Sequence, residues 1–192
     1  MTVSLIRGQN IETPPDATKI NVELGWRALA DADVEFDLNA SAFLLNSFRR
    51  VRSDADFIFY GQPKSQLGSV VHMSGGRVGR SEDEAGGAET FCVDLAALPQ
   101  DVDRIAFVVS IDDAQARGQD FSEVDSAYIR LIDARSGEEL VRFELAEDAG
   151  DCQTAIFGEL SRRDGEWVFR ALGTGLGYEL GTVARNYGVE RG

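Results

Sequence analysis

Short runs in which apolar and polar side chains alternate recur along most of the chain. Residues 20–26 alternate with the period of a half-buried β-strand. Residues 36–45 continue this pattern, with Phe36, Leu38 and Ala40 on one face, until the end of the run becomes wholly apolar. Eight further runs have strand-like composition and turn residues at their borders: 56–60, 69–72, 90–95, 104–111, 127–133, 138–145, 154–161 and 166–171.

Turn sequences and one helical pattern complete the predicted fold. Residues 133–137 and 163–165 each separate two strand-like runs, as β-hairpin turns do. Many short strands with few helical candidates favour an antiparallel β-sandwich over βαβ units. We therefore predict a single all-β domain over residues 1–192, an antiparallel sandwich of two sheets with a C-terminal amphipathic helix. The helix is indicated by apolar side chains at helical spacing: Leu176, Leu180, Val183, Ala184 and Tyr187.

The charge of the chain excludes several classes of partner. Its 192 residues carry 33 Asp and Glu against 19 Lys and Arg, a net charge of −14. The resulting field repels phosphate backbones and anionic lipid surfaces, so we predict no nucleic-acid partner. No run reaches the length of a membrane-spanning helix and the first residues do not resemble a signal peptide, which predicts a cytoplasmic protein without membrane insertion.

The residues that commonly carry catalysis are scarce. His72 is the only histidine and ends an apolar run, as a structural histidine does. Cys92 and Cys152 lie far apart without a CxxC motif, which favours reduced thiols, although a single disulfide remains open. Cys92 has the apolar neighbours of a small buried side chain, and Cys152 has acidic neighbours that disfavour its thiolate. We predict that the protein is not an enzyme.

Carboxylates at two-residue spacing are the most informative polar feature. The acids at 31, 33, 35 and 37 alternate through one segment, and Asp54 and Asp56 have the same spacing in another. Side chains spaced by two project from one face of a strand, so two such segments can surround one cation with hard oxygen donors, as Ca²⁺ prefers. An EF-hand loop starting at Asp37 would lack both its turn glycine and its final glutamate. Any calcium site in this chain must therefore be assembled from separate loops, and the alternative is an ordinary solvated acidic surface.

Eight short segments, in order along nearly the whole chain, have the sequences of one known family. They are Val-Ser-Leu at 3–5, Glu-Leu-Gly-Trp at 23–26, Asp-Leu-Asn-Ala-Ser at 37–41, Ser-Asp-Ala-Asp-Phe-Ile-Phe-Tyr at 53–60, Gly-Ser-Val-Val-His at 68–72, Asp-Ala-Gln-Ala-Arg-Gly-Gln-Asp-Phe at 113–121, Phe-Gly-Glu-Leu at 157–160 and Gly-Glu-Trp-Val-Phe-Arg-Ala at 165–171. This set resembles the TerD family of bacterial tellurite-resistance and general stress proteins. The resemblance implies a cytoplasmic β-sandwich that binds calcium through acidic loops and has no established catalytic activity.

The chain departs from this family in the loop that follows the histidine. Members usually carry a loop there that is dense in oxygen ligands, whereas residues 73–89 are longer and have two glycines in place of Asp-Asn. The remaining acids of the loop include Glu82, Asp83 and Glu84, and two arginines lie beside them. Because calcium affinity depends on the number of charged ligands, we expect at least one calcium site of the family to be weak or absent.

Two further acids complete the predicted ligand set. Asp112 stands where many relatives have histidine, next to the matching Asp113, and is either a replacement ligand or an exposed acid at a strand end. Our leading hypothesis is a non-enzymatic calcium-binding stress protein associated with tellurite resistance. Protein partners in a stress-response complex are part of this hypothesis. In it, the residues nearest the cation are Asp37, Asn39, Asp54 and Asp56. The alternative is a metal-independent interaction module that uses the rebuilt 73–89 loop.

Overall fold

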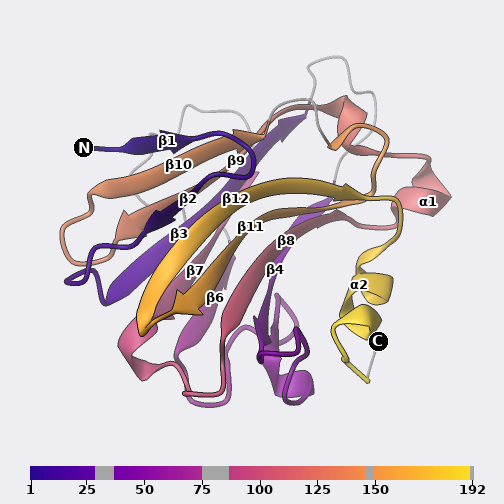
Figure 1. Cartoon of the computed structure of the whole chain (residues 1–192). Coiled ribbons are helices and arrows are strands. Elements are labelled where there is room, and N and C mark those ends of the chain that lie inside the picture. The colour runs from indigo at the N-terminus through magenta and orange to yellow at the C-terminus, as the bar shows by residue number, and fades with distance from the viewer. Residues whose placement is uncertain (29–36, 75–86, 146–148, 191–192) are drawn as a thin grey trace.

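Two six-stranded sheets pack face to face (Figure 1), as the alternation pattern predicts. The computed structural model describes residues 1–28, 37–74, 87–145 and 149–190. Strand β1 pairs parallel with β10, and the other pairings between the described strands are antiparallel. The first sheet, sheet A, has the order β1 (Val3–Leu5), β10 (Glu139–Leu145), β9 (Val124–Asp133), β3 (Lys19–Ala28), β7 (Gly87–Asp94) and β6 (Val70–Ser74).

The second sheet and the short helices complete the sandwich. Sheet B has the order β2 (Asn10–Glu12), β12 (Glu166–Leu176), β11 (Thr154–Arg163), β8 (Arg104–Ile111), β4 (Leu38–Leu45) and β5 (Phe57–Ile58). The helical segments are η1 (Asp54–Asp56), η2 (Leu95–Ala97), α1 (Ala114–Arg117), η3 (Phe121–Glu123) and α2 (Leu180–Asn186). The predicted strand 104–111 has the bounds of β8, and the predicted run 56–60 contributes only the two residues of β5.

The main core lies between the sheets. It contains large apolar side chains from both of them, and each of the largest is buried from solvent. Burying one such side chain stabilises the fold by roughly 1.5–3 kcal/mol. Side chains of this core with no measurable exposure include Leu24, Phe91, Phe107, Ile129 and Phe157.

A second apolar cluster explains why the end of the fourth strand is wholly apolar. Phe43 and Leu45 point away from the main core and pack with Val183 and Ala184 of helix α2, while Leu44 packs between the sheets. Both faces of this part of β4 are therefore covered, so neither face needs polar side chains. Figure 1 shows α2 against the outer side of sheet B.

Helix α2 begins later than the helical spacing predicts. Leu176 is the last residue of β12, where it pairs with Thr154, and the helix starts at Leu180. The backbone hydrogen bonds of the β11–β12 ladder continue through residues 174–176 and keep this segment extended. Leu176 of β12 and Leu180 of α2 both pack on the same apolar cluster. Their four-residue spacing therefore resembles that of a helix, although they belong to different elements.

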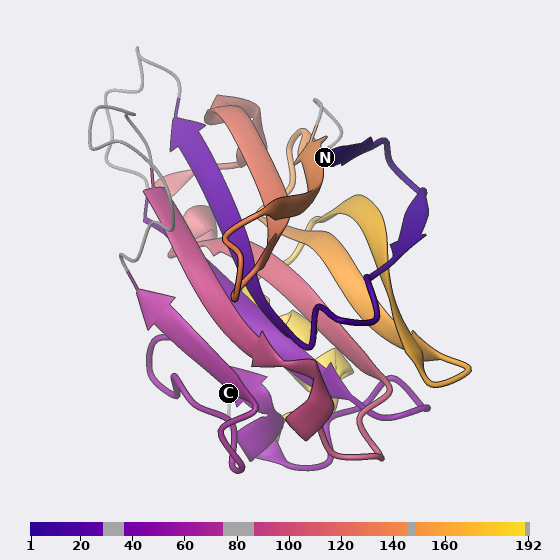
Figure 2. The ribbon, with the colours of Figure 1, turned by 90° about the vertical axis from the view of Figure 1, so that its left-hand side faces the viewer.

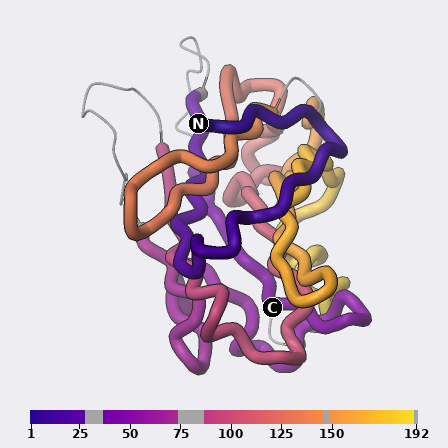
Figure 3. The backbone as a smooth tube through the Cα atoms, turned by 60° about the vertical axis from the view of Figure 1, so that its left-hand side comes forward, coloured from indigo at the N-terminus to yellow at the C-terminus, as the bar shows by residue number. Residues whose placement is uncertain are grey.

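The first strands close the open side of the sandwich and have no alternation that would predict them. Strand β1 lies beside β10 in sheet A, and the chain then crosses to place β2 beside β12 in sheet B (Figures 2 and 3). Gly8 lies at the crossing, where its amide donates to the carbonyl oxygen of Ala171 at 2.8 Å and its φ is 85°. Strands of three residues are too short to show a reliable period.

Both predicted hairpins are confirmed. The β11–β12 hairpin turns through Asp164 and Gly165, whose φ values of 50° and 85° are those of a two-residue primed turn. The β9–β10 hairpin turns through residues 134–138, where Gly137 has a φ of 75°. These turns fix the register of the two strand pairs.

Candidate functional site

Two of the predicted ligand pairs meet at one end of the sandwich. Strand β4 begins and strand β8 finishes at this end, and Leu38 pairs with Ile111 (Figure 1). The backbone amide of Asp112 donates to the carbonyl oxygen of Asp37 at 2.8 Å. The antiparallel register therefore brings two chain segments together that are 75 residues apart in sequence (112 − 37). We call this region, defined by Asp37, Asn39, Asp112 and Asp113, the acidic end.

The three carboxylates of the acidic end are open to solvent, and Asn39 is half-buried. Asp37, Asp112 and Asp113 are exposed, and the Asn39 amide donates to the Asp37 carboxylate at 3.4 Å. Asp113 precedes α1 with a φ of 49°, a left-handed conformation that aspartate tolerates better than most residues. Within the described ranges, no arginine or lysine forms an ion pair with these three carboxylates. Their negative charge is therefore not offset by a paired cationic side chain within these ranges.

Unpartnered hydroxyl groups lie in sheet B beside the acidic end. The strand register places Asn39, Ser110 and Thr154 in one row across β4, β8 and β11. Thr154 Oγ1 and Ser41 Oγ are buried, and neither has a hydrogen-bond partner among the residues that the structure describes. Buried oxygens of this kind normally take an ordered water or an ion as their partner. The sequence signal for them is weak, because serine and threonine are ordinary residues in strands.

The other predicted ligand pair lies at the opposite end of β4. Phe57, which follows Asp56, pairs with Phe43, and Phe43 is six residues along the strand from Asp37. At about 3.3 Å per residue this separates the two regions by about 20 Å. The expected convergence of Asp54 and Asp56 with Asp37 and Asn39 around one cation is therefore not formed. The pairing of β5 with β4 sets the position of Asp54 and Asp56, and residue spacing alone does not specify that pairing.

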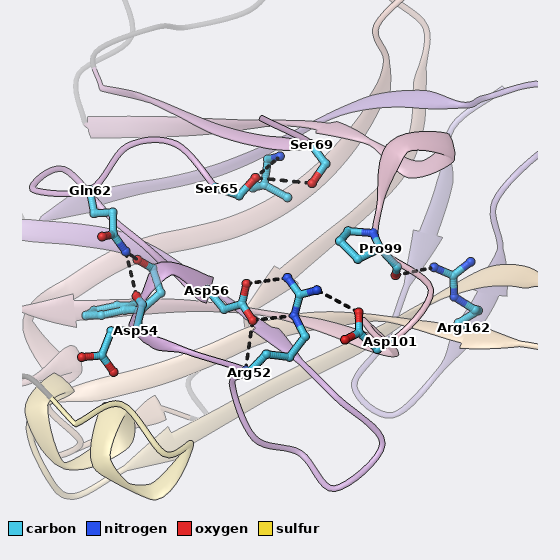
Figure 4. Close-up of polar contacts among 11 residues, drawn as sticks. Arg52, Asp54, Asp56, Gln62, Ser65, Ser69, Pro99, Asp101 and Arg162 are labelled. Atoms are coloured by element: carbon cyan, nitrogen blue, oxygen red, sulfur yellow. Dashed lines mark hydrogen bonds and ion pairs between the residues drawn. The ribbon is translucent and has the colours of Figure 1, made fainter. Parts of the chain in front are cut away.

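The Arg52 side chain binds two carboxylates at this opposite end (Figure 4). Asp56 is 2% exposed and accepts hydrogen bonds from Arg52 Nε and Nη2, both at 2.8 Å, and from the Arg52 amide at 3.0 Å. Arg52 Nη1 donates to Asp101 at 2.8 Å. The hydrogen bond to Asp56 raises the pKa of Arg52. We call the region defined by Arg52, Asp54, Asp56 and Asp101 the paired end.

Asp54 has a structural contact of its own at the paired end. Its carboxylate accepts a hydrogen bond from the backbone amide of Glu190 at 2.8 Å, just after α2. Its carbonyl oxygen accepts another from the Gln62 amide at 2.8 Å, and Gln62 also donates to Phe57 O at 2.7 Å (Figure 4). These contacts tie η1 to the C-terminal segment and to the following turn.

His72 belongs to a polar bridge between the two sheets. Its Nε2 lies 2.6 Å from Glu89 Oε2, and the same oxygen accepts a hydrogen bond from the Ala40 amide at 3.0 Å. Ala40 is in sheet B, whereas His72 and Glu89 are in sheet A. Glu89 thus satisfies a backbone donor on the open edge of β4. These contacts are those of the structural histidine that the sequence indicates.

A complete metal-ligand set is not present in the described part of the chain. Across 1–28, 37–74, 87–145 and 149–190, no three His, Cys, Asp or Glu side chains are placed to hold a metal ion. The predicted ligands Glu82, Asp83 and Glu84 lie outside the described residues. That segment joins Ser74 to Gly87, and β7 starts at the same end as β4. A cation at the acidic end therefore needs donors beyond Asp37, Asn39, Asp112 and Asp113.

Comparisons with known proteins agree with the fold and the sequence segments. The family model described as the TerD domain matches residues 1–187. The chain belongs to the TerD family. Tellurium resistance protein TerD of an Alcaligenes species is 45% identical over 98% of both chains, and general stress protein 16U of Bacillus subtilis is 41% identical over the whole of both. The TerD resemblance found in the sequence is thereby confirmed.

A solved TerD-family structure has the same fold. The crystal structure of a homologue of telluride resistance protein TerD from Streptomyces coelicolor A3(2) aligns with a TM-score of 0.65 at 19% identity. The alignment covers 87% of this chain and 95% of that one. In the described part of this TerD-family chain, no helix is long and apolar enough to cross a membrane.

Proposed function

We propose that this TerD-family protein is a calcium-binding stress protein without catalytic activity, and that calcium binds at the acidic end. The observation that carries the proposal is the contrast between two sets of carboxylates. Arg52 binds Asp56 at the paired end, whereas Asp37, Asp112 and Asp113 have no ion pair within the described ranges. Exposed carboxylates without cationic partners leave their oxygens available to a cation.

The donor chemistry of the acidic end fits a calcium ion. Carboxylate and amide oxygens are the donors that Ca²⁺ takes, and its coordination shell tolerates irregular geometry and water ligands. Asn39 offers an amide oxygen in place of a carboxylate, which retains a donor and removes a charge. Additional oxygens would come from backbone carbonyls, from water and from Glu82, Asp83 and Glu84. Asp54 and Asp56 are left out of this set because strand pairing puts them about 20 Å away, beyond the far end of β4.

Calcium would act on the stability of the protein. A ligand that binds only the folded state stabilises it, by an amount that grows with ligand concentration over the dissociation constant. Binding would also screen the repulsion among the exposed carboxylates in a chain of net charge −14. Names of the relatives support a role in resistance to tellurium and in general stress. We propose a cytoplasmic location, which the resemblance of the sequence to the TerD family implies.

Calorimetric titration of the chelator-treated chain with calcium, with magnesium as the control ion, tests the proposal. We expect saturable calcium binding together with a higher melting temperature. The double variant Asp37→Asn, Asp113→Asn should weaken binding, whereas Asp54→Asn, the matched control at the paired end, should leave it unchanged. Asparagine at 113 tolerates the left-handed backbone, so the variant tests charge rather than strain.

The absence of a binding signal up to millimolar calcium would overturn the proposal and favour the metal-independent interaction module. In that case deletion of residues 75–87 should abolish capture of a protein partner and leave the melting temperature in chelator almost unchanged. Turnover by the calcium-free or calcium-loaded protein in a substrate screen would contradict the absence of catalytic activity.

A further inference from the structure

Two sulfur atoms meet on the outer face of sheet A. Cys92 of β7 and Met73 of β6 lie diagonally across the strand pair, since Cys92 pairs with Val71 and Met73 pairs with Thr90. The thiol sulfur Sγ of Cys92 is 3.3 Å from the thioether sulfur Sδ of Met73. Neighbouring Phe91 points into the main core, so the alternation of β7 turns Cys92 away from that core.

The environment of the pair gives access to a small ligand. Met73 is 48% exposed, whereas Cys92 is half-buried. A groove of about 290 Å³ on the same sheet has Cys92, Val71, Asn21 and Ser69 among its lining residues. Burial raises the pKa of the Cys92 thiol and so disfavours its thiolate in the absence of a ligand. Reaction with a general electrophile is thereby disfavoured.

We propose that Cys92 and Met73 together bind one soft monovalent metal cation, of the class of Cu(I) and Ag(I). Thiolate and thioether are the soft donors that such cations select over oxygen donors. On binding, the Cys92 thiol releases its proton to solvent and the thiolate bonds to the cation, while the Met73 thioether supplies a second bond. No oxidation or reduction is involved.

Charge balance favours a monovalent cation at this position. One thiolate and one monovalent cation form a neutral unit, which a half-buried site accommodates without an uncompensated charge. A zinc ion would retain a positive charge and ordinarily takes four ligands. The described ranges hold no cluster of three His, Cys, Asp or Glu side chains that would provide such a shell.

The flexibility of Met73 allows the cation to enter. A cation between the sulfurs must separate them beyond their present 3.3 Å. Methionine has three rotatable side-chain bonds, and Met73 is sufficiently exposed to change rotamer without disturbing the core. The site uses sulfur donors, whereas the proposed calcium site uses oxygen donors, so either proposal can fail without the other.

Silver(I) titration of the full chain, anaerobic and in chloride-free buffer, tests the pair directly. The variant Cys152→Ser serves as the background because it removes the other thiol. With methionine methyl groups labelled with ¹³C, only two signals are present, from Met1 and Met73. We expect the Met73 signal to shift and saturate at one equivalent of silver, with the Met1 signal unchanged.

Two substitutions separate the roles of the sulfurs. In the Cys152→Ser background, Met73→Leu should weaken silver binding at least tenfold, and Cys92→Ser should abolish one-equivalent binding. Leucine has a similar volume to methionine, so the first variant should keep its fold, which circular dichroism and the melting temperature verify. Unchanged affinity in Met73→Leu, or a shift of the Met1 signal in place of Met73, would overturn the proposal.

Discussion

The two ends of the sandwich place predicted oxygen donors in different surroundings. At the paired end, Asp56 is buried and accepts three hydrogen bonds from Arg52. At the acidic end, Asp37 and Asp112 are exposed and form no ion pair within the described ranges. Two carboxylates at two-residue spacing can therefore serve as metal ligands or as ion-pair partners. The spacing alone does not distinguish these roles, and the presence of a nearby arginine favours the ion pair.

The largest expected effect concerns Arg52 at the paired end. Arg52→Ala leaves the buried Asp56 carboxylate without its partner, and we expect it to lower the free energy of unfolding by about 3–5 kcal/mol. Urea unfolding measures this loss. The combined variant Arg52→Ala, Asp56→Ala should recover part of it, because no buried charge then remains. A loss as large for Asp37→Ala would remove the contrast between the two ends.

The second prediction uses high pH to probe helix α2 beside the paired end. Burial and then the charge of Glu159 raise the pKa of Tyr187 to about 12, against 10.0 for an unperturbed tyrosine. Below pH 10 this pKa shift makes its full contribution to the free energy of unfolding. The contribution is lost as the pH rises to about 12, which lowers the free energy of unfolding by about 2–3 kcal/mol.

Unfolding measured between pH 9 and 12, with absorbance at 295 nm to follow tyrosine ionisation, checks this prediction. Tyr187→Phe keeps the ring that packs against Phe43 and should lack this part of the pH dependence. Equal pH dependence in the wild type and in Tyr187→Phe would show that other groups cause the loss.

The third prediction concerns calcium-dependent stability at the acidic end. If Asp37→Asn with Asp113→Asn weakens calcium binding tenfold, saturating calcium should stabilise the variant by about 1.4 kcal/mol less than the wild type. Thermal unfolding with and without chelator measures the difference. A similar reduction in Asp54→Asn would place calcium at the paired end instead.

The smallest expected effect is a gain of stability. Without calcium, Asp112→Asn removes one of several neighbouring negative charges, so we expect it to raise the free energy of unfolding by about 0.5 kcal/mol at low salt. The gain should shrink in high salt, as chemical unfolding in both buffers would show. A loss of stability would mean that the Asp112 carboxylate makes a favourable contact in the folded protein.

The strand pattern predicted most of the fold because alternation reports burial directly. The limits of β8 agree with the predicted 104–111, and both hairpin turns were expected from their turn residues. Strands β1 and β2 could not be predicted, since three residues with mostly exposed side chains show no period. The start of α2 was misplaced because Leu176 and Leu180 face the same apolar cluster from different elements.

The candidate site was less predictable, because it depends on pairings between distant segments. Nothing in the spacing of Asp54 and Asp56 shows that β5 joins the far end of β4. One signal was available: Arg52 precedes Asp56 by four residues, a spacing that allows an arginine–carboxylate pair. The bridge from Glu89 to the Ala40 amide crosses between sheets and has no local signal at all.

The most direct test of the account is a map of amide chemical shifts during calcium titration of the full chain. We expect saturable shifts of the amides of Asp37, Asn39, Asp112 and Asp113, with the amides of Arg52 and Asp56 unchanged. Saturable shifts centred on Arg52 and Asp56, or no shifts at millimolar calcium, would contradict the claim that the two ends have different functions.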